Sequence, residues 1–290
     1  MALSLEEFNA RREELKRRAR AEEQVSLIVG MGTCGIAAGA REVRDAMEAA
    51  LARRGLEVPL RKTGCIGICE HEVLVDVVRD GVRTTYGHVT PDMVDRIIEA
   101  HVIGGEPVAE WVIGTIEDPD SPYRDSGFYR LQERRVLRNC GFIDPDDIEE
   151  YIARDGYLAL SRVISGMTPE EVIEEVKASG LRGRGGAGFP TGQKWEFTYR
   201  AAGDVKYVVC NGDEGDPGAY MDRSVMEGDP HALLEGMAIA AYAIGASEGY
   251  IYVRAEYPLA IARLKRAIAQ AEEYGLLGPN ILGSDFSFKL

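Results

Sequence analysis

The most informative part of this 290-residue chain is the stretch Gly180-Leu-Arg-Gly-Arg-Gly-Gly-Ala-Gly-Phe-Pro-Thr-Gly-Gln-Lys-Trp-Glu-Phe197. Glycine at this density leaves the backbone without side chains, so main-chain N–H groups can approach an anionic ligand closely. The same stretch supplies cations and flat aromatic rings: Arg182, Arg184, Lys194, Phe189, Trp195 and Phe197. Glycine, positive charge and aromatic rings together favour a nucleotide or a flavin as the ligand.

Within this stretch, Gly183, Gly185 and Gly188 fit the pattern G-x-G-x-x-G. In a Rossmann unit that pattern follows a strand and opens a helix. Here a helix is predicted before the loop, because Thr168 and Glu171 form a capping box. An apolar stripe of Val172, Ile173 and Val176 continues that helix. The ordinary Rossmann interpretation therefore fails, and the motif alone is equally compatible with a flexible surface loop.

A second block reads Cys210-Asn-Gly-Asp-Glu-Gly-Asp-Pro-Gly-Ala-Tyr-Met-Asp-Arg223. Alone, its carboxylates are typical of a solvated acidic turn or of a divalent-metal site. The two blocks, in this order and at this separation, closely resemble the NADH-binding flavoprotein subunit of respiratory complex I. They are more similar still to the diaphorase subunits of NAD-linked iron hydrogenases and formate dehydrogenases. The resemblance covers about residues 24–290.

The resemblance implies that both blocks bind FMN and NAD(H), the cofactors that carry out the hydride chemistry. Residues implied at the FMN and dinucleotide site are Gly183, Arg184, Gly185, Gly186, Gly188 and Lys194. Residues implied in contact with the flavin are Asn211, Asp213 and Glu214. Phe189 and Phe197 are expected to sandwich the adenine of NADH. Asp216 matches a position near the nicotinamide that is often Glu, and it is the candidate catalytic residue.

The cysteines suggest a second site. Cys34 lies in a glycine-rich turn after a predicted strand, and Cys65 and Cys69 form a C-x3-C pair after another. Three thiols converging from loops favour an iron–sulfur cluster, although buried cysteines also serve as small apolar residues. Cys140 and Cys210 are interpreted as structural.

The region around the three cysteines resembles the thioredoxin-like [2Fe-2S] ferredoxins, which use four cysteines. Gly30 falls about where the first cysteine of that family would be. Either a non-cysteine residue or a partner therefore completes the candidate [2Fe-2S] site, or the site is degenerate.

Periodicity and turn residues predict an α/β protein. The expected strands are 25–31, 58–62, 72–78, 82–86, 206–210 and 249–254. The expected helices are 4–23, 40–54, 91–102, 145–154, 230–244 and 258–274, together with one that begins near residue 168 and precedes the glycine-rich loop. The domains follow as an N-terminal helix (1–23), a thioredoxin-like domain (24–105), a connector (106–165) and a Rossmann-like FMN/NADH-binding domain (166–290). Alternating strands and helices in the last domain predict a parallel sheet covered on both faces.

Composition limits the partners. The net charge of −14, from 34 basic and 48 acidic residues, disfavours nucleic acid and anionic membranes. The apolar run from Leu233 to Ala246 is too short to span a bilayer. The charged N-terminus does not read as a signal peptide. An odd number of scattered cysteines predicts a reducing, cytoplasmic location.

These observations predict an FMN-dependent NADH:acceptor oxidoreductase subunit that passes electrons to iron–sulfur clusters. The expected partners are a thioredoxin-like [2Fe-2S] subunit and a hydrogenase or formate dehydrogenase subunit. The family continues past the end of this chain with further flavin contacts, so the FMN site is expected to be incomplete and NADH–dye turnover is expected to need further protein. The alternative is a non-catalytic docking fragment of such a complex.

Overall fold

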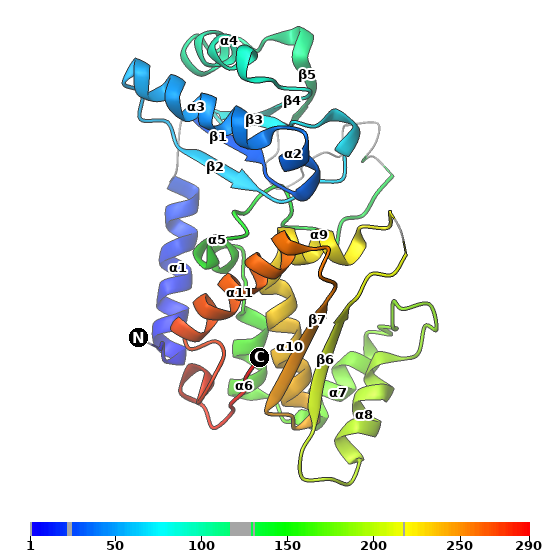
Figure 1. Ribbon diagram of the computed structural model, residues 1–290. Coiled ribbons are helices and arrows are strands. Elements are labelled where there is room, and N and C mark those ends of the chain that lie inside the picture. Colours follow the sequence, from blue (N-terminus) through cyan, green and yellow to red (C-terminus); the bar gives the residue numbers. More distant parts are fainter. Residues whose placement is uncertain (1, 22–24, 117–128, 130, 217) are drawn as a thin grey trace. The chain divides into compact units, whose positions relative to one another are not determined.

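The structure is a computed structural model that describes residues 2–21, 25–116, 129, 131–216 and 218–290. The chain forms two compact units (Figure 1). The N-terminal unit comprises Arg20–Pro145 with Glu227–Asp229, and the C-terminal unit comprises Met1–Ala19, Asp146–Met226 and Pro230–Leu290. The predicted helix end at 22–23, and residues 117–128 of the predicted connector, lie outside the described residues.

The N-terminal unit is built on a five-stranded mixed sheet with the order β2-β1-β3-β4-β5. Strand β1 pairs in parallel with β2, whereas β1–β3, β3–β4 and β4–β5 are antiparallel. The strands are β1 (Val25–Gly30), β2 (Leu60–Thr63), β3 (Val75–Arg79), β4 (Val82–Tyr86) and β5 (Val112–Ile116). The β2-β1-β3-β4 arrangement is that of a thioredoxin-like sheet, and this part of the fold prediction is confirmed.

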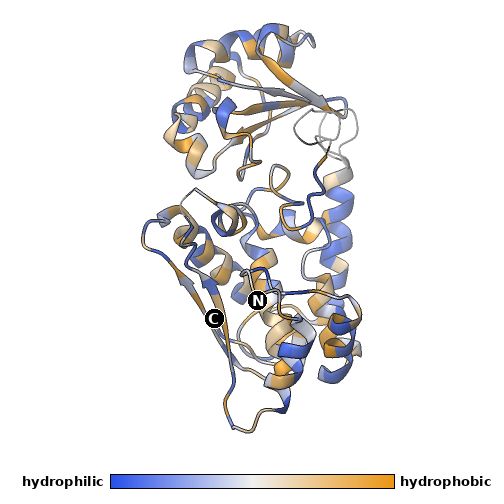
Figure 2. Ribbon diagram, turned by 90° about the vertical axis from the view of Figure 1, so that its right-hand side faces the viewer, coloured by the Kyte–Doolittle hydropathy of each residue, from blue (hydrophilic) through white to orange (hydrophobic). Residues whose placement is uncertain are grey.

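The helices of this unit pack on one face of its sheet. Helix α3 (Ala40–Arg54) buries Val43 and Met47 against β1, and it ends at Gly55, whose positive φ of 64° stops the helix. A helical segment of mixed type, Pro91–Ile103, joins the same core. The α-helical part of this segment is α4 (Val94–Ile97), and the short helix α2 (Thr33–Ala37) precedes α3. Hydrophobic residues (orange) gather along this sheet and its helices in Figure 2.

Several features of this unit differ from the sequence-based prediction. Strand β2 covers Leu60–Thr63 instead of 58–62, and helix α2 was not predicted. Strand β3 begins at Val75 rather than residue 72, because the carboxylate of Glu72 turns back to accept the Leu74 N–H at 3.1 Å. Strand β5 was missed altogether. Its apolar alternation is short and lies among prolines and charges, and only pairing with β4 makes it a strand. The predicted domain boundaries themselves stay a prediction.

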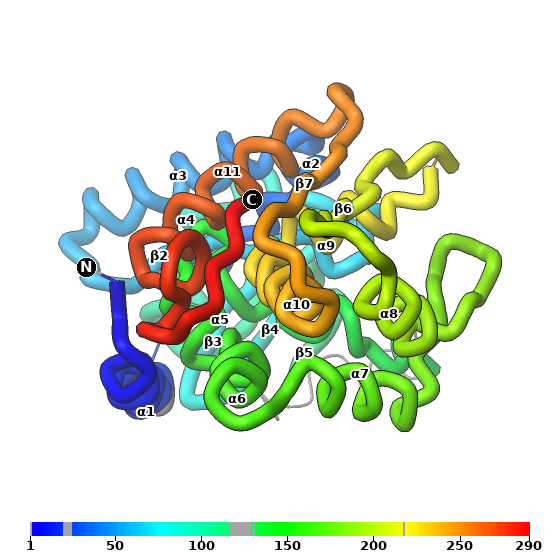
Figure 3. The backbone as a smooth tube through the Cα atoms, turned by 90° about the horizontal axis from the view of Figure 1, so that it is seen from below, coloured from blue at the N-terminus to red at the C-terminus, as the bar shows by residue number. Residues whose placement is uncertain are grey.

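The C-terminal unit contains a two-stranded parallel sheet of β6 (Tyr207–Gly212) and β7 (Glu248–Val253). Helix α10 (Pro230–Ile244) packs on both strands, and α7 (Pro169–Ala178) and α8 (Thr191–Arg200) lie side by side (Figure 3). The remaining helices are α1 (Leu5–Ala21), α5 (Ile148–Ala153), α6 (Leu158–Gly166), α9 (Met221–Gly228) and α11 (Pro258–Glu273). Predicted and observed bounds of α10 coincide. No described helix is both long and apolar enough to cross a membrane.

The prediction that helices cover both faces of this sheet is wrong for the part of the chain that the structure describes. Tyr207, Val209, Tyr250 and Tyr252 are 52%, 64%, 57% and 63% exposed. These residues alternate with inward-facing ones, as the two-residue period of a strand requires. Helix α10 therefore covers one face, and the other presents aromatic rings to solvent.

A buried carboxylate organises the centre of the C-terminal unit. Glu235 of α10 accepts hydrogen bonds from the Tyr151 hydroxyl at 2.6 Å, the Tyr157 N–H at 2.8 Å and the Leu160 N–H at 3.1 Å. The Tyr157 hydroxyl in turn lies 2.9 Å from Nδ1 of His231, one turn earlier on α10. This network ties α10 to α5 and α6.

Helix α1 is hydrophilic over most of its surface and appears mainly blue in Figure 2. Ser4 and Glu7 form the predicted capping box, with the Ser4 N–H donating to Glu7 Oε2 at 2.8 Å. Its thin apolar stripe is nevertheless buried, since Phe8 is 0% and Leu15 3% exposed. Lys16 pairs with Asp155 at 2.5 Å. The helix is thus an integral part of the C-terminal unit.

Glycine 192 is predicted to be essential for the packing of α7 on α8. A Cβ at this position would lie 2.6 Å from the backbone nitrogen of Lys177. We expect Gly192→Ala to lower the free energy of unfolding by about 1–3 kcal/mol, because backbone must move to relieve the clash. Gly236→Ala on α10 is the control, because nothing lies within 4 Å of its Cβ position; it should be neutral or stabilising in urea unfolding.

Burial lowers the pKa of His231 to about 4, from 6.5. The unfolded chain therefore takes up the proton first on acidification, and stability present above pH 6.5 is lost as the pH falls towards 4, by about 3 kcal/mol. We expect His231→Gln to flatten this dependence in urea unfolding between pH 7 and pH 4. His88→Gln, a substitution at an exposed histidine, is the control. An unchanged pH dependence of stability in His231→Gln would contradict the prediction.

Candidate cofactor sites

The glycine-rich loop emerges between α7 and α8 and is closed at its base by the backbone. Thr168 and Glu171 cap α7 as predicted. The Thr168 N–H donates to Glu171 Oε2 at 2.7 Å, and the Glu171 N–H donates to the Thr168 hydroxyl oxygen at 3.3 Å. The Gly183 N–H donates to the Phe189 carbonyl at 2.8 Å, and the Thr191 N–H donates to the Leu181 carbonyl at 2.9 Å. These bonds fix the neck of a loop that follows a helix, so the departure from the Rossmann pattern is confirmed.

The tip of this loop is open. No atom lies within 4 Å of the Cβ positions of Gly185 and Gly186, and Gly186 has a φ of 94° that favours glycine. Open space at these two glycines is what close approach of a ligand to the backbone requires.

The two predicted adenine-binding rings are neighbours. Phe189 is 46% and Phe197, on α8, is 57% exposed. Their ring centres are 6.3 Å apart, and the planes are tilted by 50°. A flat ring stacked between two others needs about 7 Å and parallel planes, so the pair must open and align to hold an adenine. Lys194 is exposed on α8, the helix that carries Phe197.

The second block forms the turn that follows β6. Asn211 is exposed at the end of the strand, and its Oδ1 accepts the Asp213 N–H at 3.0 Å, which shapes the turn. Asp213 and Asp216 are exposed. In the described ranges, no group of three or more His, Cys, Asp or Glu side chains is arranged to hold a metal ion, so the divalent-metal interpretation of this turn gains no support.

Glu214 differs from its neighbours because it is buried, at 6% exposure. Its carboxylate accepts the N–H groups of Met221, Asp222 and Arg223 at the start of α9, the last two at 3.3 and 3.2 Å, and the Tyr257 hydroxyl at 3.1 Å. A carboxylate at this end of a helix is stabilised by the helix dipole. Glu214 therefore anchors α9, and its predicted flavin contact stays a prediction.

The three predicted cluster cysteines are brought together in the N-terminal unit. The sulfur atoms of Cys65 and Cys69 are 3.6 Å apart, and Cys69 also interacts with Cys34. The Gly32 turn packs closely on Cys65, since a Cβ at Gly32 would lie 2.9 Å from the Cys65 Cβ. Two thiolates on one tetrahedral metal at about 2.3 Å lie about 3.8 Å apart, which is close to the Cys65–Cys69 separation. Among the described residues, however, no group of three or more His, Cys, Asp or Glu side chains is arranged to hold a metal ion, and the three cysteines are no exception.

Burial raises the pKa of Cys65 and of Cys69, and the nearby Cys65 sulfur raises the pKa of Cys69 further. These thiols are therefore protonated at neutral pH unless a cation is bound, and a bound metal would displace their protons. Cys140 is fully buried in the same unit and packs against Gly228. Cys210, half-buried on β6, has its pKa raised by burial.

Two carboxylates beside the cysteines had not been predicted. Glu227 is 1% exposed and accepts the Thr33 N–H at 3.0 Å and the Thr33 hydroxyl at 2.5 Å, next to Cys34. Glu72 is half-buried, and burial raises its pKa to about 7. Nothing near Glu227 in the sequence signals this role, because residues 33 and 227 meet only in the folded chain.

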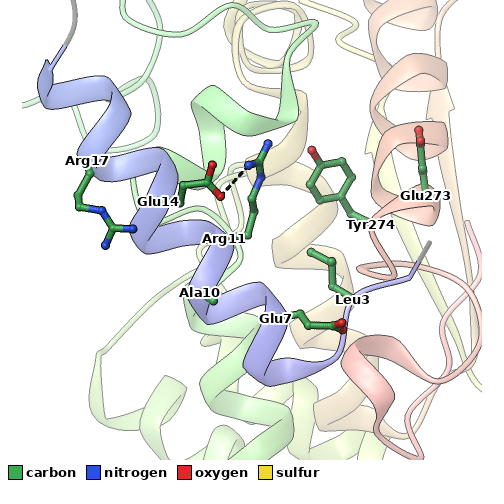
Figure 4. Close-up of a pocket in the computed structure, with 8 residues that line it drawn as sticks. All are labelled: Leu3, Glu7, Ala10, Arg11, Glu14, Arg17, Glu273 and Tyr274. Carbon is green, nitrogen blue, oxygen red and sulfur yellow. Dashed lines mark hydrogen bonds and ion pairs between the residues drawn. The ribbon is translucent and has the colours of Figure 1, made fainter.

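One hollow lies away from the predicted cofactor residues. A cavity of about 690 Å³ lies between α1 and the end of α11 (Figure 4). Its lining residues are Leu3, Glu7, Ala10, Arg11, Glu14, Arg17, Glu273 and Tyr274. Two of these lining residues, Arg11 and Glu14, form an ion pair on α1, with Nη1 of Arg11 2.8 Å from Oε2 of Glu14. None of the predicted cofactor residues lines it. A smaller cavity of about 380 Å³ adjoins the neck of the glycine-rich loop, at Arg182 and Pro190.

Replacing Glu214 by Gln is predicted to destabilise the C-terminal unit. The amide cannot accept all the N–H groups that the carboxylate accepts, and the charge at the start of α9 is lost. We expect the free energy of unfolding to fall by about 1–3 kcal/mol, measured by urea denaturation. Exposed Asp204→Asn is the matched control, and equal stability of the two variants would refute the anchoring role.

Comparison with known proteins adds independent findings. Residues 176–286 match the Nuo51 FMN-binding domain. The chain is 62% identical over 161 residues to the NADP-reducing hydrogenase subunit HndC of Solidesulfovibrio fructosivorans, which covers 56% of this chain and 32% of that one. It is 54% identical over 153 residues to an NADH-quinone oxidoreductase subunit of Rhizobium meliloti. That match covers 53% of this chain and 36% of the other one.

A solved thioredoxin-like [2Fe-2S] ferredoxin from Aquifex aeolicus is 31% identical, with a TM-score of 0.29, over 32% of this chain and 99% of that one. The chain spans about a third of the length of each of these two relatives, the hydrogenase subunit and the quinone oxidoreductase subunit. The resemblance inferred from the glycine-rich and acidic blocks is thereby confirmed: residues 176–286 match the Nuo51 FMN-binding domain.

Proposed function

We propose that this protein is an electron-input subunit that oxidises NADH through FMN and passes electrons to iron–sulfur clusters of a larger redox complex. The observation that carries this proposal is the match of residues 176–286 to an FMN-binding domain, together with an open glycine-rich loop in that region. The names of the relatives, a hydrogenase subunit and a quinone oxidoreductase subunit, agree with it.

The chain's own residues would position the cofactors. Backbone N–H groups of Gly183–Gly188, with Arg184 and Lys194, would hold phosphate groups, since exposed N–H groups and cations both attract anions. Phe189 and Phe197 would align on an adenine. Asn211 and Asp213 would contact the flavin from the turn after β6, and Asp216 would lie near the nicotinamide. Bound FMN would supply the ring that accepts hydride.

The three cysteines would hold a [2Fe-2S] cluster and provide the exit for electrons from the same polypeptide. The 3.6 Å separation of two of the sulfurs supports this part of the proposal. A cluster of this type is bound by two ligands on each of its two irons. The thiols therefore need not all surround one metal ion.

The proposed partners are a thioredoxin-like [2Fe-2S] subunit and a hydrogenase or formate dehydrogenase subunit, in the cytoplasm. The exposed tyrosines of β6 and β7 support a need for further protein, because large exposed apolar patches commonly mark interaction surfaces. Five cysteines without a disulfide support a reducing compartment.

The test is FMN binding by the purified chain and by its complex with partner subunits, because the FMN site of the chain alone is expected to be incomplete. We expect Gly185→Val to weaken FMN binding at least about tenfold, because its side chain would occupy the space in which a phosphate approaches the backbone. That space is empty in the protein, so the substitution should leave stability unchanged. Gly236→Ala on α10 is the control. Fluorescence titration measures the Kd, and circular dichroism checks the fold.

FMN binding that is equal in Gly185→Val and the parent chain would exclude the loop from the flavin site. Absence of FMN binding both by the chain and by its complex with partner subunits would favour the non-catalytic docking alternative. NADH and NADPH are then compared as reductants of the FMN-loaded complex, with ferricyanide as acceptor, because the relatives' names include both nucleotides.

A further inference from the structure

The two cysteines of the turn that follows β2 lie with their sulfur atoms in contact. Sγ of Cys65 and Sγ of Cys69 are 3.6 Å apart, and both residues are free thiols. A disulfide bond is about 2.0 Å long. The two sulfurs therefore need to approach each other by only about 1.6 Å to form one.

The turn between these cysteines has room for such an adjustment. Gly67, at its centre, has a φ of 94°, and no atom lies within 4 Å of the position that its Cβ would take. The Gly67 N–H donates to Sγ of Cys65 at 3.3 Å, which helps to hold that sulfur within the turn. A small movement of the turn on the side of Gly67 therefore meets no packed neighbour.

The two thiols differ in their access to solvent. Cys69 is exposed, whereas Cys65 is half-buried. Cys140, in the same unit, is 0% exposed and is shielded from reagents in solution. A reagent that enters from solution is therefore expected to react first with Cys69, and Cys65 then supplies a second thiol within contact distance.

We propose that Cys65 and Cys69 form a reactive dithiol that reduces a small disulfide of the glutathione type and closes into an intrachain disulfide. The Cys69 sulfur attacks the small disulfide and breaks its S–S bond, which releases one thiol and leaves a mixed disulfide on Cys69. Cys65 then attacks Sγ of Cys69, which forms the Cys65–Cys69 bond and releases the second thiol. The two protein thiols give up two electrons and two protons, and the small disulfide takes them up as it becomes two thiols.

This reaction goes beyond the proposed function, because it requires neither FMN nor a cluster. A cluster bound here would use the same two sulfurs, so a chain in the disulfide form cannot bind one through them. Burial raises the pKa of both thiols. Because only the thiolate attacks a disulfide, we expect the first step to be slow at neutral pH.

The experiment uses the full chain, treated with a chelator, reduced, desalted and then incubated with excess glutathione disulfide at mildly alkaline pH. Peptide mapping by mass spectrometry should find Cys65 joined to Cys69, with the mass of the linked peptides lower by two hydrogen atoms. Dithiothreitol should restore all five free thiols of the chain.

Three variants assign the roles of the sulfurs. Cys65→Ser removes the thiol of the second step, so glutathione should stay bound to Cys69. Cys69→Ser removes the exposed thiol and should slow the reaction at residue 65 at least about tenfold. Cys34→Ser is the matched control: Cys34 also interacts with Cys69, and this variant should still form the Cys65–Cys69 bond.

Mapping of the parent chain needs no substitution, so a variant that fails to fold leaves the test intact. A parent chain in which both thiols stay free after prolonged incubation overturns the proposal. A lasting glutathione adduct on Cys69, or a disulfide between Cys34 and Cys69, overturns it as well. FMN binding is judged by its own fluorescence titration, and its failure leaves the dithiol reaction in place.

Discussion

The C-terminal unit depends on the hydrogen bonds that the buried carboxylate of Glu235 accepts. An ionised carboxylate loses its hydration on burial, and this cost is offset only when its oxygens are hydrogen-bonded. Glu235 receives one hydroxyl and two backbone N–H groups, which come from the α5 and α6 region. The geometry of these donors fixes where α10 can lie. Because α10 covers β6 and β7, it also fixes where the acidic turn after β6 begins.

Carboxylates serve distinct purposes in the two candidate sites. Glu214 and Glu227 have all their oxygens committed to backbone N–H groups or hydroxyls, and they hold the ends of α9 and α2. Asp213 and Asp216 are exposed and remain accessible to a ligand. Within an acidic loop, burial and hydrogen-bond saturation therefore distinguish an anchoring residue from a candidate ligand-binding residue, although the residue types are the same.

The glycines also have more than one purpose. Gly185 and Gly186 leave empty space at the tip of a loop, which suits a ligand. Gly192 and Gly32 instead permit close contact between segments of the chain, because a Cβ at either position would clash with a neighbour. A pattern of glycines in the sequence does not separate these cases. The distinction depends on which atoms face the missing side chain.

The sequence by itself determined the local features. The capping box of Thr168 and Glu171, the bounds of α3 and α10, and the turn at Asp80-Gly81 depend on neighbouring residues, so they could be predicted. The two long motifs likewise identified the FMN-binding region, because each is contiguous along the chain. The gathering of the three cysteines was predicted from their loops and from the family resemblance.

Only the tertiary structure decided the features that join distant residues. Strand β5 exists because β4 supplies its hydrogen bonds, and one face of β6 and β7 stays exposed among the described elements. Glu227 reaches Thr33, and Glu72 lies beside Gly30, through folding of the chain rather than through any local pattern. A carboxylate's role depends on the donors around it, and those donors come from segments up to 194 residues away. Local propensity carries no information about such pairs.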